Sequence, residues 1–202
     1  MKVRSVLSAI LALVLMGPAS IASAAAPAST DPLDFVKQRY EELQSVVKKF
    51  PEKDKMQQGI REVMERFVDY PELSRRTLAD QWDKLAKGQR SEFVGEFKKM
   101  IQRSYVKRFD PGIVFTIDYT GERRAETDGA VTIPSIIRSG RSEAKVEYTV
   151  RTVSGKWLAF DVVVDDVSMV RTYRKQFHDI ILKDGFKGLL ERLRKRNAAS
   201  QE

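Results

Sequence analysis

Cysteine is absent from the 202 residues of the chain, and histidine occurs only once. The lack of cysteine excludes disulfide bonds, thiolate zinc sites and cysteine nucleophiles. A single histidine excludes a metal centre with several histidine ligands. Hydrophobic residues make up 42% and charged residues 32% of the chain, which is typical of a globular protein with a buried core. We therefore expect packing to stabilise the fold, without disulfide bonds or structural metals.

Acidic residues are in the minority, since 28 Asp and Glu stand against 36 Lys and Arg and give a net charge of +8. A basic chain usually has a polyanionic partner, which can be a nucleic acid, an anionic membrane surface or an acidic protein. Composition alone leaves these three classes of partner open.

Long hydrophobic runs are also missing, and the longest apolar stretch, 6–16, is far shorter than the roughly 20 residues of a membrane span. This stretch follows Lys2 and Arg4 and precedes small residues that end in an A-x-A pattern at Ala24. The arrangement predicts a signal peptide over 1–24 that is cleaved after Ala24, with cleavage after Ala26 as the alternative. An uncleaved anchor is the less favoured interpretation.

Cleavage would lower the net charge to +6, because Lys2 and Arg4 are the only charged residues of the segment. An exported protein is not expected to bind nucleic acid, and a cysteine-free exported chain suggests the periplasm of a Gram-negative bacterium. The small residues 25–30 then form a linker, and we expect a single domain over 31–196 with a polar tail over 197–202.

Apolar periodicity changes twice along the domain. Spacings of three and four residues predict helices over 31–50, 51–68, 71–82 and 89–109. Alternating apolar residues then predict about four strands within 113–164, and helical spacing returns over 166–181 and 186–196, with Asp166 as the expected helix cap. Short turns between successive strands indicate an antiparallel sheet. The expected fold class is α+β, with N-terminal helices, a curved sheet and C-terminal helices.

Catalytic motifs are missing as well. His178 and Asp179 are neighbours on a predicted helix, so their side chains point about 100° apart and cannot form an orienting pair. Asp165 and Asp166 lack the ligand spacing of a calcium loop. We therefore predict no catalytic residue, no metal and no cofactor. An enzyme remains the alternative, with an acid such as Asp118 or Asp161 as the base in an apolar cavity.

Two parts of the chain resemble the MlaC family, which is also called the toluene-tolerance auxiliary family. The first part comprises 68–73 (VDYPEL), Leu78, Trp82, Gln89-Arg90 and 93–105, and the second comprises 157–170, Tyr173-Arg174, Gln176-Phe177 and the Leu-rich terminal helix after Gly185. The chain departs from the family pattern at Ala79 and Asp166, where the family has glycine. Because Asp166 lacks the freedom of glycine at positive φ, the turn there is expected to differ.

The resemblance implies a periplasmic phospholipid carrier with a partly NTF2-like fold that encloses an apolar cavity. Acyl chains would lie inside and the head group would face water. The implied partners are an outer-membrane lipoprotein complex and an inner-membrane ABC transporter with an MCE-domain subunit. The carrier would be a monomer that shuttles lipid between these complexes and maintains outer-membrane lipid asymmetry.

We expect the cavity wall to combine the apolar face of the sheet with the stripes of the flanking helices; a closed core is the competing interpretation of the same residues. From the sheet and the segment before it we expect Phe115, Ile117, Val131, Ile133, Val146, Tyr148 and Val150. From the helices we expect Phe97, Met100, Ile101, Tyr105, Val170, Tyr173 and Phe177. Trp82 and Trp157 are expected to be structural, and Arg174 to lie on a solvated helix face or in an ion pair.

Basic residues gather at the C-terminus of the chain. Residues 166–202 hold nine basic and five acidic side chains, and Arg194, Lys195 and Arg196 are consecutive. We hypothesise that this helix favours acidic partners or anionic membrane surfaces.

Overall fold

The computed structural model describes residues 31–199. The predicted signal peptide (1–24), the predicted linker (25–30) and the last residues of the predicted tail lie outside the described residues. Within the described part, no helix is both long enough and apolar enough to cross a bilayer.

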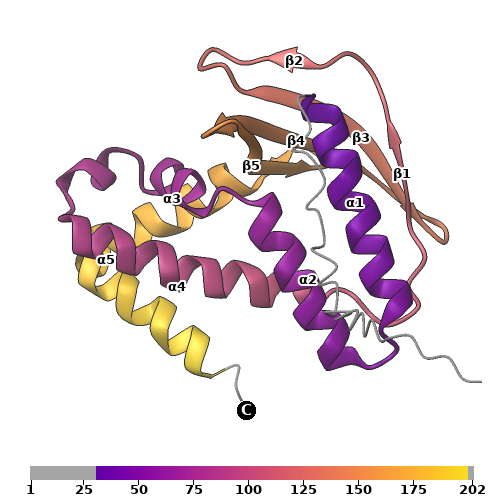
Figure 1. Ribbon diagram of the computed structural model, residues 1–202. Coiled ribbons are helices and arrows are strands. Elements are labelled where there is room, and N and C mark those ends of the chain that lie inside the picture. The colour runs from indigo at the N-terminus through magenta and orange to yellow at the C-terminus, as the bar shows by residue number, and fades with distance from the viewer. Residues whose placement is uncertain (1–30, 200–202) are drawn as a thin grey trace, which may run out of the picture.

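Residues 31–199 form five α-helices, one 3₁₀ segment and a single sheet (Figure 1). The helical elements are α1 (Pro32–Lys49), α2 (Lys53–Phe67), α3 (Tyr70–Leu78), η1 (Ala79–Lys84), α4 (Lys87–Val106) and α5 (Met169–Ala198). The strands are β1 (Thr116–Tyr119), β2 (Arg124–Ala125), β3 (Val131–Ser139), β4 (Ser142–Val153), β5 (Lys156–Val164) and β6 (Val167–Ser168).

Side-chain caps define where three helices begin. The Asp31 carboxylate accepts hydrogen bonds from the backbone N–H groups of Leu33 and Asp34 at the start of α1. Asp69 caps α3, and Ser168 caps α5 by accepting a hydrogen bond from Arg171 N at 3.0 Å. These polar side chains satisfy backbone donors that have no partner within the helix.

The prediction that Asp166 caps the C-terminal helix is wrong. Asp165 and Asp166 both have positive φ, 46° and 65°, and form the tight turn between β5 and β6. Aspartate tolerates the left-handed conformation better than most residues other than glycine, so the turn forms here without glycine. The N-cap of α5 is Ser168, two residues after the predicted one.

The sheet is antiparallel, with strand order β1-β3-β4-β5-β6 and with β2 paired to β3. The four longer strands correspond to the predicted four, and the short strands β2 and β6 raise the number to six. Opposite Thr149 and Val150, β5 contains one extra residue, Phe160, because Thr149 pairs with Asp161 and Val150 pairs with Ala159. Such a bulge bends a strand and increases its twist, which explains the curvature of the sheet here.

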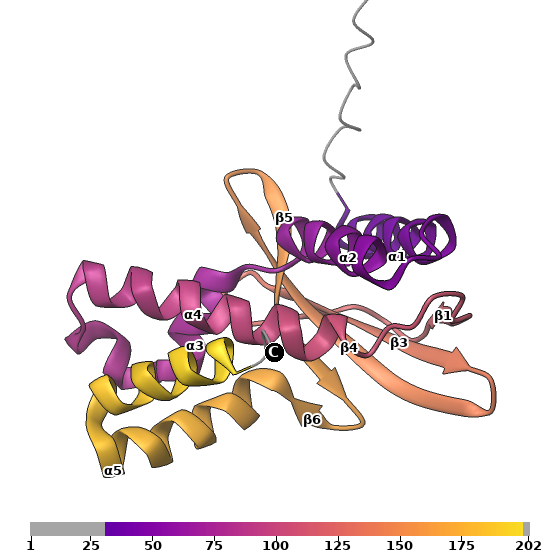
Figure 2. The same ribbon diagram turned by 90° about the horizontal axis from the view of Figure 1, so that it is seen from below.

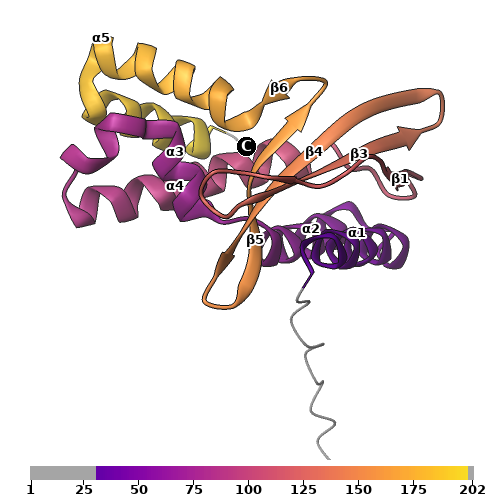
Figure 3. The same ribbon diagram turned by 90° about the horizontal axis from the view of Figure 1, so that it is seen from above.

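The helices form two separate groups around the sheet. Helices α1 and α2 lie side by side along one face, and α3, α4 and α5 pack together beside the sheet (Figures 2 and 3). Gly185, with φ 68° and ψ 177°, breaks α5 so sharply that its second half folds back along the first (Figure 2). The second half continues to Ala198, and Asn197, within the predicted tail, is buried and donates to Glu96.

Three apolar clusters hold these layers together. The helical core joins α3, α4 and α5 and includes Phe93, Phe97 and Phe177. The sheet core joins the start of α1 to β3, β4 and β5, and the α1–α2 core contains Met56 and Ile60. All five of these named side chains are at most 3% exposed, so the helical core and the α1–α2 core are almost fully shielded from water.

Candidate functional site

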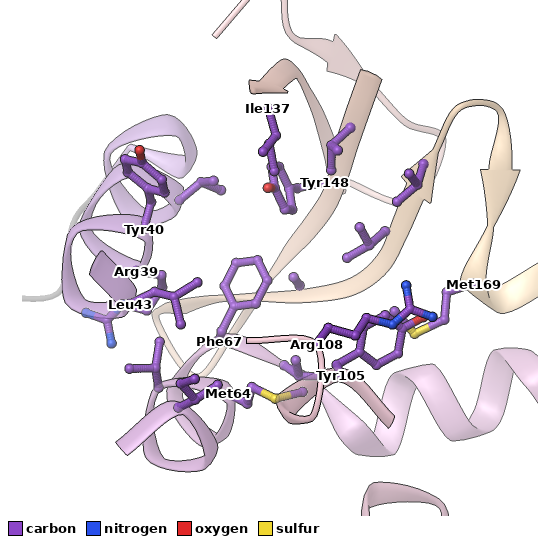
Figure 4. A pocket seen from close by; sticks show the side chains of 18 of the residues that line it. Arg39, Tyr40, Leu43, Met64, Phe67, Tyr105, Arg108, Ile137, Tyr148 and Met169 are labelled. Atoms are coloured by element: carbon purple, nitrogen blue, oxygen red, sulfur yellow. The ribbon is translucent and has the colours of Figure 1, made fainter. Parts of the chain in front are cut away.

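A cavity of about 430 Å³ lies between the α1–α2 pair, the end of α4 and the inward face of the sheet (Figure 4). Helix α1 contributes Val36, Tyr40 and Leu43, and α2 contributes a second stripe that includes Ile60 and Phe67. Spacings of three and four residues place each set on one helical face. The helical side of the cavity is thus almost entirely apolar.

The sheet side of the cavity follows from strand alternation. Val146 and Tyr148 of β4 lie opposite Val164 and Val162 of β5, and all four side chains line the cavity. The bulge adds Phe160, which also lines the wall. A regular strand would turn alternate residues to the other face, so the bulge allows both Ala159 and Phe160 to contribute.

The solvent-exposed part of the cavity wall lies at the end of α4 and the end of β5. Among the lining residues, only Arg108 and Val164 are exposed, and the rest are buried or half-buried. Arg108 follows α4, lies over the Tyr105 ring at 5.1 Å from the guanidinium carbon to the ring centroid, and extends beside Met169 (Figure 4). The mouth therefore carries a cation beside an aromatic ring.

The charged and hydroxyl groups of the wall are few, and most already have partners. Asp161 accepts hydrogen bonds from Ser168 Oγ at 2.6 Å and from Val170 N at 3.0 Å, one on each carboxylate oxygen. Ser139 Oγ donates to the Val114 carbonyl.

Arg39 pairs with Glu42 at 2.8 Å, and burial lowers the pKa of its guanidinium. Burial also raises the pKa of Tyr148, so this phenol is neutral in the cavity.

The two acids considered as catalytic bases are both engaged elsewhere. Asp161 holds the start of α5, and Asp118 is exposed and paired with Arg138. His178 is exposed on α5. Within residues 31–199, no group of three or more His, Asp or Glu side chains is arranged to hold a metal ion.

Five of the fourteen residues expected to bind lipid line the cavity: Ile101, Tyr105, Phe115, Val146 and Tyr148. The structure places the other nine outside its wall, although no ligand is present to test any of the fourteen. Five of the nine belong to the helical core or pack against it: Phe97, Met100, Val170, Tyr173 and Phe177. The reason is that α5 packs on α4 and leaves only the last turns of α4 beside the cavity.

The remaining four residues lie on the expected sheet but away from the cavity. Val131, Ile133 and Val150 face inward, yet the start of α1 packs on this end of the sheet with Phe35 and Val36. Ile117 pairs with Ile137 across β1 and β3, and it is Ile137 that lines the wall. The inward face of the sheet therefore lines the cavity only beyond the end that the start of α1 covers.

Sequence reasoning missed the contributions of α1, α2 and the segment after α4. The apolar stripes of α1 and α2 were visible in the sequence, but their spacing does not show which surface they cover. Phe109 and Ile113, in the segment after α4, line the wall too. Arg174, expected on a solvated helix face or in an ion pair, is exposed on α5, donates to the Arg76 carbonyl and does not line the cavity.

The fold and the site define an α+β protein with an apolar internal cavity that is open at one charged end. A family model described as MlaC protein matches residues 36–195. This match covers most of the chain, and the protein belongs to the MlaC family. The resemblance seen in the sequence is therefore confirmed.

The following solved structure is among those that share the fold. It is described as the phospholipid-binding protein from Ralstonia solanacearum in complex with a phospholipid, and it matches with a TM-score of 0.76 at 22% sequence identity. The match covers 85% of this chain and 99% of that one. The comparison with curated proteins gave no match.

Proposed function

We propose that the protein binds a phospholipid with its acyl chains in the cavity and carries it between membranes. The observation that carries this proposal is the apolar cavity, enclosed by α1, α2 and the sheet and open beside Arg108 and Val164. Its volume of about 430 Å³ lies within the range of ligand cavities. Family membership and the phospholipid in the similar structure support the same ligand.

Transfer energetics explain why a carrier of this design is useful. Two acyl chains contain about 30 methylenes, and at about 0.8 kcal/mol each their exposure to water costs on the order of 20 kcal/mol. A cavity lined by Leu, Ile, Val, Phe and Met side chains offsets most of this cost without any covalent step. Release then requires a partner that competes for the lipid or changes the packing around it.

The setting of the proposed carrier is the periplasm, reached through the signal peptide predicted over 1–24. Its proposed partners are the outer-membrane lipoprotein complex and the inner-membrane ABC transporter with an MCE-domain subunit. The basic C-terminal helix is less available for docking than its composition indicates, since Arg194 pairs with Glu92 and Arg192 with Asp184. Docking through this helix therefore stays a hypothesis.

Organic extraction of the natively purified protein, followed by mass spectrometry of the extract, tests the binding step. We expect about one equivalent of phospholipid per protein. A protein that is purified without lipid and fails to take it up from vesicles would overturn the proposal, whereas hydrolysed lipid in the extract would indicate an enzyme. N-terminal sequencing of the exported protein should begin at residue 25, or at residue 27 for the alternative cut.

A further inference from the structure

We infer that Arg108 is a recognition residue for the phosphate group of the bound lipid. This inference rests on the proposed function and extends it, because it assigns a polar contact at the mouth of an otherwise apolar site. Arg108 is one of only two exposed lining residues, and the other, Val164, cannot form a hydrogen bond through its side chain. A lipid with its acyl chains inside would leave its phosphate at this opening.

The charge of Arg108 is not neutralised by an acid. Every other arginine or acid of the cavity wall has a bonded partner: Arg39 pairs with Glu42, and Asp161 is hydrogen-bonded through both oxygens. Among the described residues, Arg108 makes no salt bridge, and its guanidinium only lies against the Tyr105 ring. The mouth thus holds one unpaired cation in contact with the cavity.

The neighbours of Arg108 also favour a phosphate ligand. A guanidinium offers several N–H donors in a planar fork that fits two oxygens of a phosphate. Stacking on Tyr105 restricts the side chain to one side of the opening, so less conformational freedom is lost when a ligand binds. The partly apolar surroundings strengthen the ionic contact relative to one in bulk water.

Binding measurements with matched lipids separate this contact from the cavity itself. Phosphatidylglycerol and a diacylglycerol with identical acyl chains differ by the phosphoglycerol group, so only the first offers a phosphate to Arg108. The variants are Arg108→Gln, which removes the charge, Arg108→Lys, which keeps the charge without the fork, and Lys107→Gln. Lys107 is the matched control because it is an adjacent exposed base that does not line the cavity.

We expect Arg108→Gln to weaken phosphatidylglycerol binding about five- to tenfold and to leave diacylglycerol binding within about twofold. Arg108→Lys should recover part of the loss, and Lys107→Gln should bind both lipids like the wild type. Added salt should weaken phosphatidylglycerol binding in the wild type more than in Arg108→Gln. Thermal unfolding of the lipid-free variants should match the wild type, since Arg108 is exposed.

Two outcomes would overturn the assignment. If Arg108→Gln weakens both lipids equally, Arg108 is part of the wall and does not recognise phosphate. If it weakens neither, the phosphate lies elsewhere. Failure of the wild type to bind either lipid would instead refute the proposed function, so the two failures are distinguishable.

Discussion

Arg76 lies over the ring of Phe160, with 4.1 Å between the guanidinium carbon and the ring centroid. Phe160 lines the cavity, while Arg76 pairs with Glu72 and with Asp128. The bulged segment of β5 is therefore held by apolar contacts on the cavity side and by a charged network behind it. Cation–π contacts of this kind stabilise partly desolvated rings.

Glu72 is the centre of this network, and its charge should contribute to stability. Burial tends to raise the pKa of its carboxyl, but hydrogen bonds from Arg75 and Arg76 and the charge of Arg151 outweigh burial and lower the pKa to about 2. A lowered pKa means that the contribution is complete above about pH 4.5 and is lost as the pH falls towards 2. Its size is about 3 kcal/mol.

Glu72→Gln should accordingly lower the free energy of unfolding at pH 7 by about 2–4 kcal/mol, and the difference from the wild type should shrink as the pH falls from 4.5 to 2. Urea unfolding at a series of pH values measures this. Glu143→Gln is the control, because Glu143 is an exposed ion-pair partner of Arg138, and it should leave stability almost unchanged. A pH-independent effect of Glu72→Gln would contradict the prediction.

Val146 and Val150 lie on the same strand and the same face, yet only Val146 lines the cavity. Val146→Trp should fill part of the cavity and lower the affinity for phospholipid about tenfold or more, because each displaced methylene is worth about 0.8 kcal/mol. Lipid per protein, measured by mass spectrometry, tests this. Unchanged occupancy in Val146→Trp would show that the acyl chains lie elsewhere.

Val150→Trp is the matched substitution in a closed core, where Val150 is 0% exposed. Overpacking there should lower the free energy of unfolding by about 1–3 kcal/mol, as urea unfolding would show, without a specific loss of lipid from the folded protein. A selective loss of lipid in this variant would place the cavity at the opposite end of the sheet.

Local patterns in the sequence predicted the helices, the longer strands and the inward face of the sheet, because periodicity depends only on nearby residues. The position of the cavity could not be predicted in this way. The stripe of α4 is continuous in the sequence, but Phe93 and Phe97 pack on α5 while Tyr105 lines the cavity. Which part of a stripe packs against which element depends on contacts between distant segments. The same is true of the absence, among the described residues, of an acid that pairs with Arg108.

The two departures from the family pattern both occur where φ is positive. Ala79 has φ 45° and ψ −126°, and Asp166 has φ 65°. Ala79→Gly should relieve backbone strain and raise the free energy of unfolding by about 1 kcal/mol. Asp166→Gly should have a smaller effect of the same sign, because aspartate tolerates its conformation better. A lower urea midpoint for Ala79→Gly would disprove the strain.

Replacing Gly185 tests the opposite change, in which a residue other than glycine introduces backbone strain. The φ of 68° and ψ of 177° at Gly185 form a conformation that only glycine adopts readily. Gly185→Ala should lower the free energy of unfolding by about 1–3 kcal/mol by opposing the reversal of α5. Gly95→Ala is the matched control within α4, where nothing lies within 4 Å of the added methyl group. Gly95→Ala should raise the free energy of unfolding by about 0.5–1 kcal/mol. Urea unfolding should therefore show changes of opposite sign for the two variants.

The closely packed cores of the molecule mostly involve residues that do not line the cavity. Phe93, Phe97 and Phe177 help to join α3, α4 and α5 without lining the cavity. The chain therefore has a source of cohesion that is independent of any occupant, and filling or emptying the cavity need not coincide with folding or unfolding. For the proposed carrier, such a framework would allow repeated rounds of loading and release without unfolding between them.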